Sequence, residues 1–286
     1  MRQVRMRKPV RSILVIAVST AAVMVGSASA GAASTNAELA LLYNYEFAGT
    51  TGTVVNSAPY GPVAPLTLKG DWSPVPGGVD FSGNTTGKSS VAFANPASGY
   101  TLNEPPRAAI GFGARILYYA PASGTCFGDT PNITQIGRYD ATKLPTQAKI
   151  QLSNCATSAK HVLMECRFAG LTTIPGQDPP LVSTMPLLNG GEYNVSCVKS
   201  PDSGGSTTIT LTVTRVRTGQ TVTNTTTVTA LGVLRSRAYL SAGNHYPLPA
   251  PVHNTDQFDG HMTRTVYCAG APANVTSCLR TYLPVN

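Results

Sequence analysis

An alternating run of threonine and aliphatic residues between Thr207 and Arg217 constrains the fold of this chain most strongly. Successive side chains of a strand point to opposite faces, so this run predicts a strand with one face on a core and the other in water. Thr218 and Gly219 interrupt the pattern before a second Thr/Val-rich run, 221–229, and the two runs together predict a β-hairpin. The alternation consists of Ile209, Leu211 and Val213 between Thr208, Thr210, Thr212 and Thr214.

Strand signals recur along the rest of the chain, and almost no segment has the pattern of a helix. Short strands separated by Gly and Pro clusters are typical of an all-β protein, here a β-sandwich. No Pro/Ser-rich linker divides the sequence, so we expect one domain spanning residues 31–286. Besides the hairpin, the predicted strands are 41–47, 54–55, 66–68, 79–81, 109–119, 133–136, 148–152, 162–168, 193–198, 238–240 and 262–267.

The first thirty residues have the organisation of an export signal. Five basic residues precede an apolar run over 13–25, and the small residues Ala28-Ser29-Ala30 follow it. The apolar run is about 13 residues long, which is short for a membrane span, so a cleaved signal peptide over residues 1–30 is favoured over an uncleaved anchor. We therefore predict a secreted, extracellular protein that leaves the membrane once the signal is removed.

Most of the positive charge of the chain belongs to this predicted signal. The whole sequence has 21 Lys and Arg against 13 Asp and Glu. The signal takes five basic residues and no acidic ones with it, which leaves 16 against 13 and a net charge of about +3. The sequence thus gives no support for a nucleic-acid partner.

All six cysteines lie in the predicted exported part. An even number of cysteines in an oxidising compartment favours disulfides over a metal site, and the chain has no Cys-x-x-Cys pair. Sequence alone leaves the pairing open, but closing each cysteine onto its nearest neighbour gives the least entangled set. These bonds are Cys126–Cys155, Cys166–Cys197 and Cys268–Cys278.

Several short motifs follow one another along nearly the whole predicted mature chain. They are Leu42-Tyr43-Asn44-Tyr45-Glu46-Phe47 before Gly49 and Gly52, Leu66-Thr67-Leu68 before Gly70, Gly78-Val79-Asp80-Phe81, Gln135-Ile136-Gly137-Arg138, Lys149-Ile150-Gln151-Leu152, Cys166-Arg167-Phe168 and Asn189-Gly190-Gly191-Glu192-Tyr193 up to Cys197. Together they resemble the laminin G-like branch of the concanavalin A-like lectin/glucanase superfamily, as found in secreted actinobacterial proteins. The resemblance implies that the predicted sandwich is a two-sheet antiparallel jelly roll, and that the two central cysteines bridge neighbouring strands, in agreement with the second proposed bond.

The chain departs from that family at two positions. Tyr193-Asn194 stands where the family usually has Trp-His, and Thr263 stands where the closing strand usually carries Asp. The loss of this carboxylate removes the basis for any inherited polar contact at the end of the closing strand.

The acidic residues do not form the pair that glycoside hydrolases use. The closest two, Asp256 and Asp259, are offset by three and would point to opposite faces of a strand. A pair contributed by two different strands stays open, because sequence cannot show which acids meet in space. Polysaccharide lyases of the superfamily carry His where this chain has Gly137, and no nucleophile or zinc motif is present.

We therefore predict a non-catalytic binding module for a glycan or an extracellular protein surface. A hydrolase or lyase on the same scaffold, or a structural module of the cell envelope, are the alternatives. The candidate binding residues lie in a loop before the closing strand, which is either a plain surface loop or a ligand-facing rim, and at the single tryptophan, which belongs either to the core or to a sugar-stacking site. They are His245, Tyr246, His253 and Asp256 in the loop, and Trp72.

No cofactor is required by this interpretation, although calcium is possible. Asp256 and Asp259 with Asn254 could supply part of a shell, which backbone carbonyls and water would have to complete. Five Asn-x-Ser/Thr sequons, at Asn84, Asn132, Asn194, Asn224 and Asn274, are a weak indication that these asparagines are exposed. The oligomeric state cannot be inferred from the sequence.

Overall fold

The Thr/Val-rich segment forms the predicted hairpin in the computed structural model. Strand β13 (Ser206–Arg215) pairs antiparallel with β14 (Thr221–Thr229) without a register shift. Gly219 has a φ of 67° in the connecting turn, a conformation that glycine adopts without strain. The aliphatic side chains of β13 are buried, and Thr208, Thr210, Thr212 and Thr214 are directed to the outer face, so the predicted alternation is confirmed.

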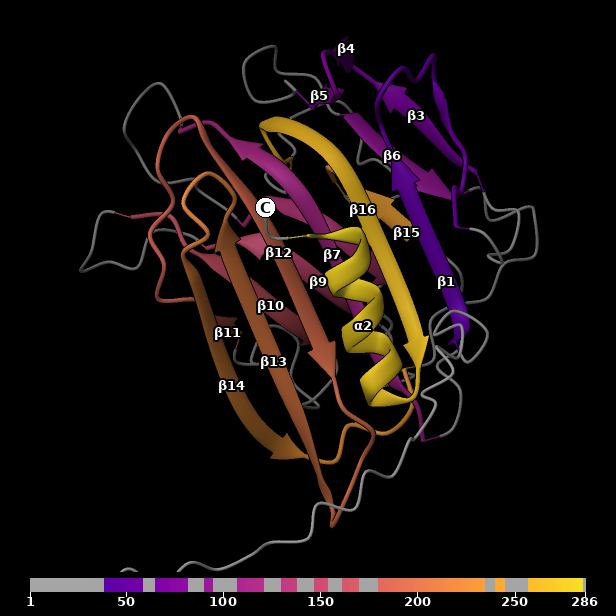
Figure 1. Cartoon of the computed structure of the whole chain (residues 1–286), viewed down its shortest axis with the longest axis vertical. Coiled ribbons are helices and arrows are strands. Elements are labelled where there is room, and N and C mark those ends of the chain that lie inside the picture. Colours follow the sequence, from indigo (N-terminus) through magenta and orange to yellow (C-terminus); the bar gives the residue numbers. More distant parts are fainter. Residues whose placement is uncertain are drawn as a thin grey trace, which may run out of the picture. The chain divides into compact units, whose positions relative to one another are not determined.

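The model describes ten segments of the chain, which belong to one compact unit of residues 34–286. Figure 1 shows their strands and the helix that lies over them. Residues 1–38, including the predicted signal peptide, lie outside the described residues. The described segments are 39–58, 65–81, 90–94, 107–120, 130–137, 147–153, 161–169, 180–234, 240–244 and 257–284.

Eight strands form the first antiparallel sheet, which we call sheet A. Its order is β14, β13, β12, β7, β16, β5 and β4, and β1 pairs with β16 beside β5. Beyond the hairpin, its strands are β1 (Leu39–Glu46), β4 (Ser73–Val75), β5 (Gly78–Phe81), β7 (Ala109–Tyr118), β12 (Gly191–Lys199) and β16 (Gly260–Gly270).

Eight further strands form the second antiparallel sheet, sheet B, in the order β11, β10, β9, β8, β15, β6, β3 and β2. The chain crosses repeatedly between the two sheets, as in a jelly roll, and the predicted fold class is confirmed. The strands are β2 (Thr53–Val54), β3 (Leu66–Gly70), β6 (Ser90–Ala94), β8 (Asn132–Gly137), β9 (Gln147–Leu152), β10 (Met164–Ala169), β11 (Leu181–Val182) and β15 (Leu240–Ala242).

The inner faces of both sheets meet in one large hydrophobic core. Aromatic rings from the two sheets contact each other there, for example Phe112 of β7 and Phe168 of β10, whose centroids are 6.1 Å apart. The Cys166–Cys197 disulfide crosses the same core from β10 to β12. The predicted pairing is thus confirmed, but the bond joins facing sheets rather than neighbouring strands of one sheet.

A polar cluster is enclosed in this core. The hydroxyl of Tyr267 shares a short hydrogen bond with Thr134 and donates to the carbonyl of Ser241 at 3.2 Å. Thr134 is also 3.1 Å from the hydroxyl of Thr265. Burial raises the pKa of Tyr267 to about 12, although the hydrogen bonds to the two threonines act in the opposite direction.

The described residues include a helix that the strand pattern did not predict, α2 (Pro272–Tyr282). Pro272 stands at its first turn, where the missing N–H costs nothing. Its apolar stripe of Val275, Cys278 and Leu279 packs on the outer face of sheet A. The Cys268–Cys278 disulfide then ties the helix to β16, which confirms the second of the two pairings that the described residues can test. The third pairing, Cys126–Cys155, lies outside the described residues.

Two glycines of β7 make room for this helix. A Cβ atom on Gly111 would lie 2.5 Å from Cγ1 of Val275, and one on Gly113 would lie 2.6 Å from Cδ1 of Leu283. Their missing side chains let α2 lie directly on the strand, and Figure 1 shows the helix in front of this part of sheet A. Within the described segments, no helix is long and apolar enough to cross a membrane.

Candidate functional site

Of the five predicted binding residues, the structure describes only Trp72. Trp72 precedes β4, at the edge of sheet A, and is half-buried against the hydrophobic core. The loop residues His245, Tyr246, His253 and Asp256 lie outside the described residues, as does Asn254 of the predicted calcium site. Their role in binding and the calcium site therefore stay predictions. The described residues contain no group of three or more His, Cys, Asp or Glu side chains arranged to hold a metal ion.

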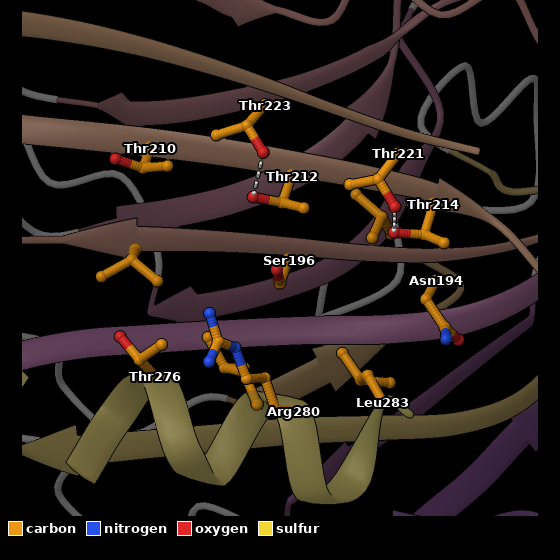
Figure 2. Close-up of a pocket in the computed structure, with 13 residues that line it drawn as sticks. Asn194, Ser196, Thr210, Thr212, Thr214, Thr221, Thr223, Thr276, Arg280 and Leu283 are labelled. Carbon is orange, nitrogen blue, oxygen red and sulfur yellow. Dashed lines mark hydrogen bonds between the residues drawn. The ribbon is translucent and has the colours of Figure 1, made fainter. Parts of the chain in front are cut away.

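An open groove lies instead between α2 and the threonine-bearing strands, on the outer face of sheet A (Figure 2). We call it the helix groove. Its volume of about 390 Å³ lies at the lower end of the range for small-ligand sites. It is lined by Asn194, Val195, Ser196 and Val198 of β12, Thr210, Thr212 and Thr214 of β13, Thr221 and Thr223 of β14, and Thr276, Leu279, Arg280 and Leu283 at the helix side.

The floor of the helix groove is a regular array of threonine hydroxyls. Register places each outward threonine of β13 opposite one of β14. The hydroxyl oxygens are 3.3 Å apart in the Thr212–Thr223 pair and 2.9 Å apart in the Thr214–Thr221 pair. Two similar pairs, Thr208–Thr227 and Thr210–Thr225, continue the array. Each hydroxyl both donates and accepts, so the floor can form hydrogen bonds with either kind of partner.

Asn194 supplies a fixed amide to the groove lining. Its Nδ2 donates to the carbonyl of Pro284 at 2.7 Å, and because a carbonyl only accepts, this bond determines the orientation of the amide. The Oδ1 atom is then buried without a hydrogen-bond partner among the described residues, and Asn194 is only 5% exposed. The indication that its sequon marks an exposed asparagine is wrong for Asn194, and also for Asn132, which is 1% exposed.

Arg280 is the charged residue of the lining. Its side chain extends from the last turn of α2 toward the strands, as Figure 2 shows. It forms no ion pair with a described residue, and no lining residue carries a carboxylate. Two other arginines of the same face are paired: Nε of Arg115 is 2.6 Å from Glu192, and Nη2 of Arg264 is 2.6 Å from Glu46.

A second polar cluster lies on the outer face of sheet A, where β5 meets β16. Register pairs Asp80 with His261, whose Nε2 is 3.7 Å from the Asp80 carboxylate, and the ring of Tyr119 packs edge-on against His261. Burial raises the pKa of Asp80, while His261 lowers it. Burial and then the charge of Asp80 raise the pKa of Asp259. The sequence could not show this proximity, because the two acids are far apart in the chain.

The outer face of sheet B also carries a polar row. Cross-strand register aligns Ser241, Gln135, Lys149 and Arg167 on neighbouring strands. Gln135 and Ser241 are at most 1% exposed, whereas Lys149 and Arg167 are partly exposed. The helix groove is the better candidate, because its polar side chains line an open volume.

Thr263 stands where the family resemblance led us to expect a carboxylate. It lies at an irregularity of β16 between Met262 and Arg264, and its hydroxyl donates to the carbonyl of Arg115 at 3.3 Å. An ionised carboxylate could not donate this bond. The closing strand therefore uses this position to join β7 rather than to present an acid.

Sequence analysis missed the helix groove because it missed α2. The apolar spacing of Val275, Cys278 and Leu279, with Pro272 before them, is the signal that could have predicted the helix. Arg280 would then have been placed on its exposed side. The threonines of the groove were recognised, but only as the solvent face of a hairpin.

No protein-family model matches the chain, and a comparison with curated proteins finds no match. Solved structures with a similar arrangement include the Trypanosoma rangeli sialidase in complex with 2,3-difluorosialic acid, with a TM-score of 0.47 and 13% identity over 86% of this chain and 33% of that one. The botulinum neurotoxin serotype G binding domain has a TM-score of 0.44 and 9% identity over 84% of this chain and 50% of that one.

A basic winged bean lectin with Tn-antigen is similar over the full length of its chain. It has a TM-score of 0.39 and 12% identity over 81% of this chain and 99% of that one. This chain spans only 50% and 33% of the lengths of the toxin domain and the sialidase. At these low identities and TM-scores, the similarities carry no information about what this chain binds.

Proposed function

We propose that the protein is an exported, non-catalytic module of the laminin G-like kind that binds a short glycan in the helix groove. The observation that carries the proposal is the composition of the groove, in which nine of the thirteen lining residues are polar. Seven of them are threonine or serine, whose hydroxyls can exchange hydrogen bonds with the hydroxyls of a sugar.

The apolar part of the lining fits the same ligand class. Leu279, Leu283 and Val198 contribute aliphatic surface beside the hydroxyl array. Sugars present C–H faces as well as hydroxyl groups, and binding sites for small ligands combine apolar walls with a few placed polar groups. The disulfides Cys166–Cys197 and Cys268–Cys278 are typical of proteins that work in an oxidising compartment, which supports export.

The floor of the groove can be tested with a threonine-to-valine double variant. Thr212→Val with Thr223→Val keeps the β-branched shape of both side chains but removes two hydroxyls from the lining. We expect the oxidised protein to bind glycans on an array of neutral and charged oligosaccharides, and the double variant to lose about tenfold in affinity or more, as for loss of one or two good hydrogen bonds.

A matched control is available on the same ladder. Thr208→Val with Thr227→Val removes an equivalent cross-strand hydroxyl pair that does not line the groove. This control should bind like the unchanged protein. Equal loss of affinity in both double variants, or no glycan bound by the unchanged protein, would contradict the proposal.

One observation favours a second candidate function, glycoside hydrolysis or lyase activity on the same scaffold. Asp80 and Asp259 lie near enough to influence each other, and His261 is beside them. A pair of carboxyl groups in different environments is what acid–base chemistry on glycans requires. Release of reducing ends or unsaturated products by the unchanged protein, and its loss in Asp80→Asn and in Asp259→Asn, would establish this function instead.

A further inference from the structure

We infer that the helix groove selects glycans that carry a carboxylate, with Arg280 pairing the carboxylate of a hexuronate unit. This inference rests on the proposed glycan-binding function and names the class of sugar that the groove takes.

The charge distribution around the groove is the first argument. Arg115 and Arg264 lie on the same outer face, and each is held by a carboxylate at 2.6 Å. Arg280 has no such partner among the described residues, and none of the thirteen lining side chains is acidic. A guanidinium without a carboxylate partner, beside a hydroxyl array, leaves an uncompensated positive charge that an anionic ligand would neutralise.

The position of Arg280 is the second argument. It stands on α2, opposite the hydroxyls of Ser196 and the β13 threonines, so a ligand lying on that floor would contact the guanidinium from the side (Figure 2). The helix cannot swing away readily, because the Cys268–Cys278 disulfide ties its C-terminal half to β16 and the Asn194–Pro284 hydrogen bond holds the segment that follows it. A guanidinium can bind a carboxylate through two parallel N–H···O bonds, which fixes the orientation of the sugar unit.

Asn194 is the third argument. Its Oδ1 is a buried acceptor without a partner, in a residue that lines the groove. Leaving such an acceptor unpaired is unfavourable. A donor that reaches it after a small shift of the lining is therefore favoured, and a sugar hydroxyl is a suitable donor, whereas a sulfate group only accepts. A sugar unit also presents several hydroxyls beside its carboxylate, so the combination of Arg280, Asn194 and the hydroxyl floor favours an acidic sugar over an inorganic anion.

The experiment compares each acidic polysaccharide with its own neutral form. Polygalacturonate, alginate and hyaluronan are tested beside their carboxyl-reduced counterparts, and dextran sulfate and inorganic phosphate serve as other anions. Binding to the oxidised protein is measured at low salt and at ~0.5 M NaCl. We expect at least one carboxylated polymer to bind about tenfold tighter than its reduced form, and the difference to shrink at high salt.

Three variants assign the effect to Arg280. Arg280→Gln should abolish the preference for the carboxylated form, and Arg280→Lys should retain part of it because the charge remains. Arg217→Gln removes one positive charge from an exposed position outside the groove and should leave the preference unchanged. Circular dichroism of each variant verifies that the fold is intact.

The outcomes separate this inference from the proposed function. If carboxylated and reduced glycans bind equally, or if Arg217→Gln weakens binding as much as Arg280→Gln, the groove binds glycans but the carboxylate inference is wrong. If dextran sulfate or phosphate binds as tightly as the best carboxylated polymer, the inference is also wrong. If no polysaccharide binds at all, the proposed function itself is wrong.

Discussion

Cys278 of α2 is bonded to Cys268 of β16, ten residues earlier in the chain. This bond holds the wall of the helix groove against sheet A, whereas the Cys166–Cys197 bond crosses the core between the sheets. The two disulfides therefore contribute to different properties of the protein.

Replacing Cys268 and Cys278 by Ala should lower the affinity for the ligand, because the bond positions α2, while most of the free energy of unfolding is retained. The closed loop is short, so we expect a loss of about 2–3 kcal/mol in the free energy of unfolding, measured by urea denaturation. Replacing Cys166 and Cys197 opens a longer loop of 31 residues and should cost about 3–4 kcal/mol, with binding retained while the protein stays folded. Equal binding by both double variants would show that α2 keeps its position without its bond.

Alanine at Gly113 should destabilise the protein more than alanine at Gly111. A Cβ on Gly111 would meet only the ends of the Val275 and Leu279 side chains, which can shift. A Cβ on Gly113 would collide with the backbone carbonyl of Val195, which is fixed by strand pairing. We expect a loss of about 1 kcal/mol for Gly111→Ala and about 3 kcal/mol for Gly113→Ala in urea denaturation. The reverse order would contradict the close packing of α2 on β7.

Alkaline unfolding should depend on Tyr267. Its folded pKa of about 12 lies above the ordinary value of 10.0, so the folded state favours the neutral phenol. This contribution to stability is fully present below pH 10 and is lost as the pH rises toward 12. Tyr267→Phe should therefore flatten the loss of stability over this range, at a cost of about 1–2 kcal/mol at neutral pH from the lost hydrogen bonds. Ultraviolet absorbance during an alkaline titration follows the formation of phenolate. The prediction is contradicted if every tyrosine ionises near the ordinary pKa of 10.0.

Asp259 should destabilise the fold at neutral pH. Its pKa is raised first by burial and second by the charge of Asp80, so the folded state favours the protonated acid. The stability that this group provides is present below the ordinary pKa of 3.8 and is lost as the pH rises through its folded-state pKa.

Asp259→Asn should accordingly raise the melting temperature at pH 7 and have little effect at pH 3. The gain should shrink in an Asp80→Asn background, because one of its two causes has then been removed. If the gain in melting temperature is the same in the Asp80→Asn background, the charge of Asp80 does not contribute, and burial is the sole cause of the raised pKa of Asp259.

The strand pattern could be predicted because burial imposes a two-residue period on the sequence. It located β13 and β14 and most other strands of both sheets, and nearest-neighbour closure gave the Cys166–Cys197 and Cys268–Cys278 bonds. The strands β4 (Ser73–Val75), β6 (Ser90–Ala94) and β11 (Leu181–Val182) were missed. They are short, and β6 is buried on both faces, so its residues do not alternate between apolar and polar.

The helix groove could not be predicted, because it depends on strand order. Asn194, Thr212 and Arg280 are far apart in the sequence and meet only because β12 lies between β13 and β7, with α2 packed over β7. The proximity of Asp80 and Asp259 depends in the same way on the pairing of β5 with β16. Local periodicity carries no information on either juxtaposition.

The position of β16 has a consequence for how the molecule is made. This strand pairs with β7 on one side and with β1 and β5 on the other, yet it is the last strand of the described chain. The first sheet thus stays split into two separate halves until residue 270 has left the ribosome. No truncation that ends before β16 contains the strand that unites those halves.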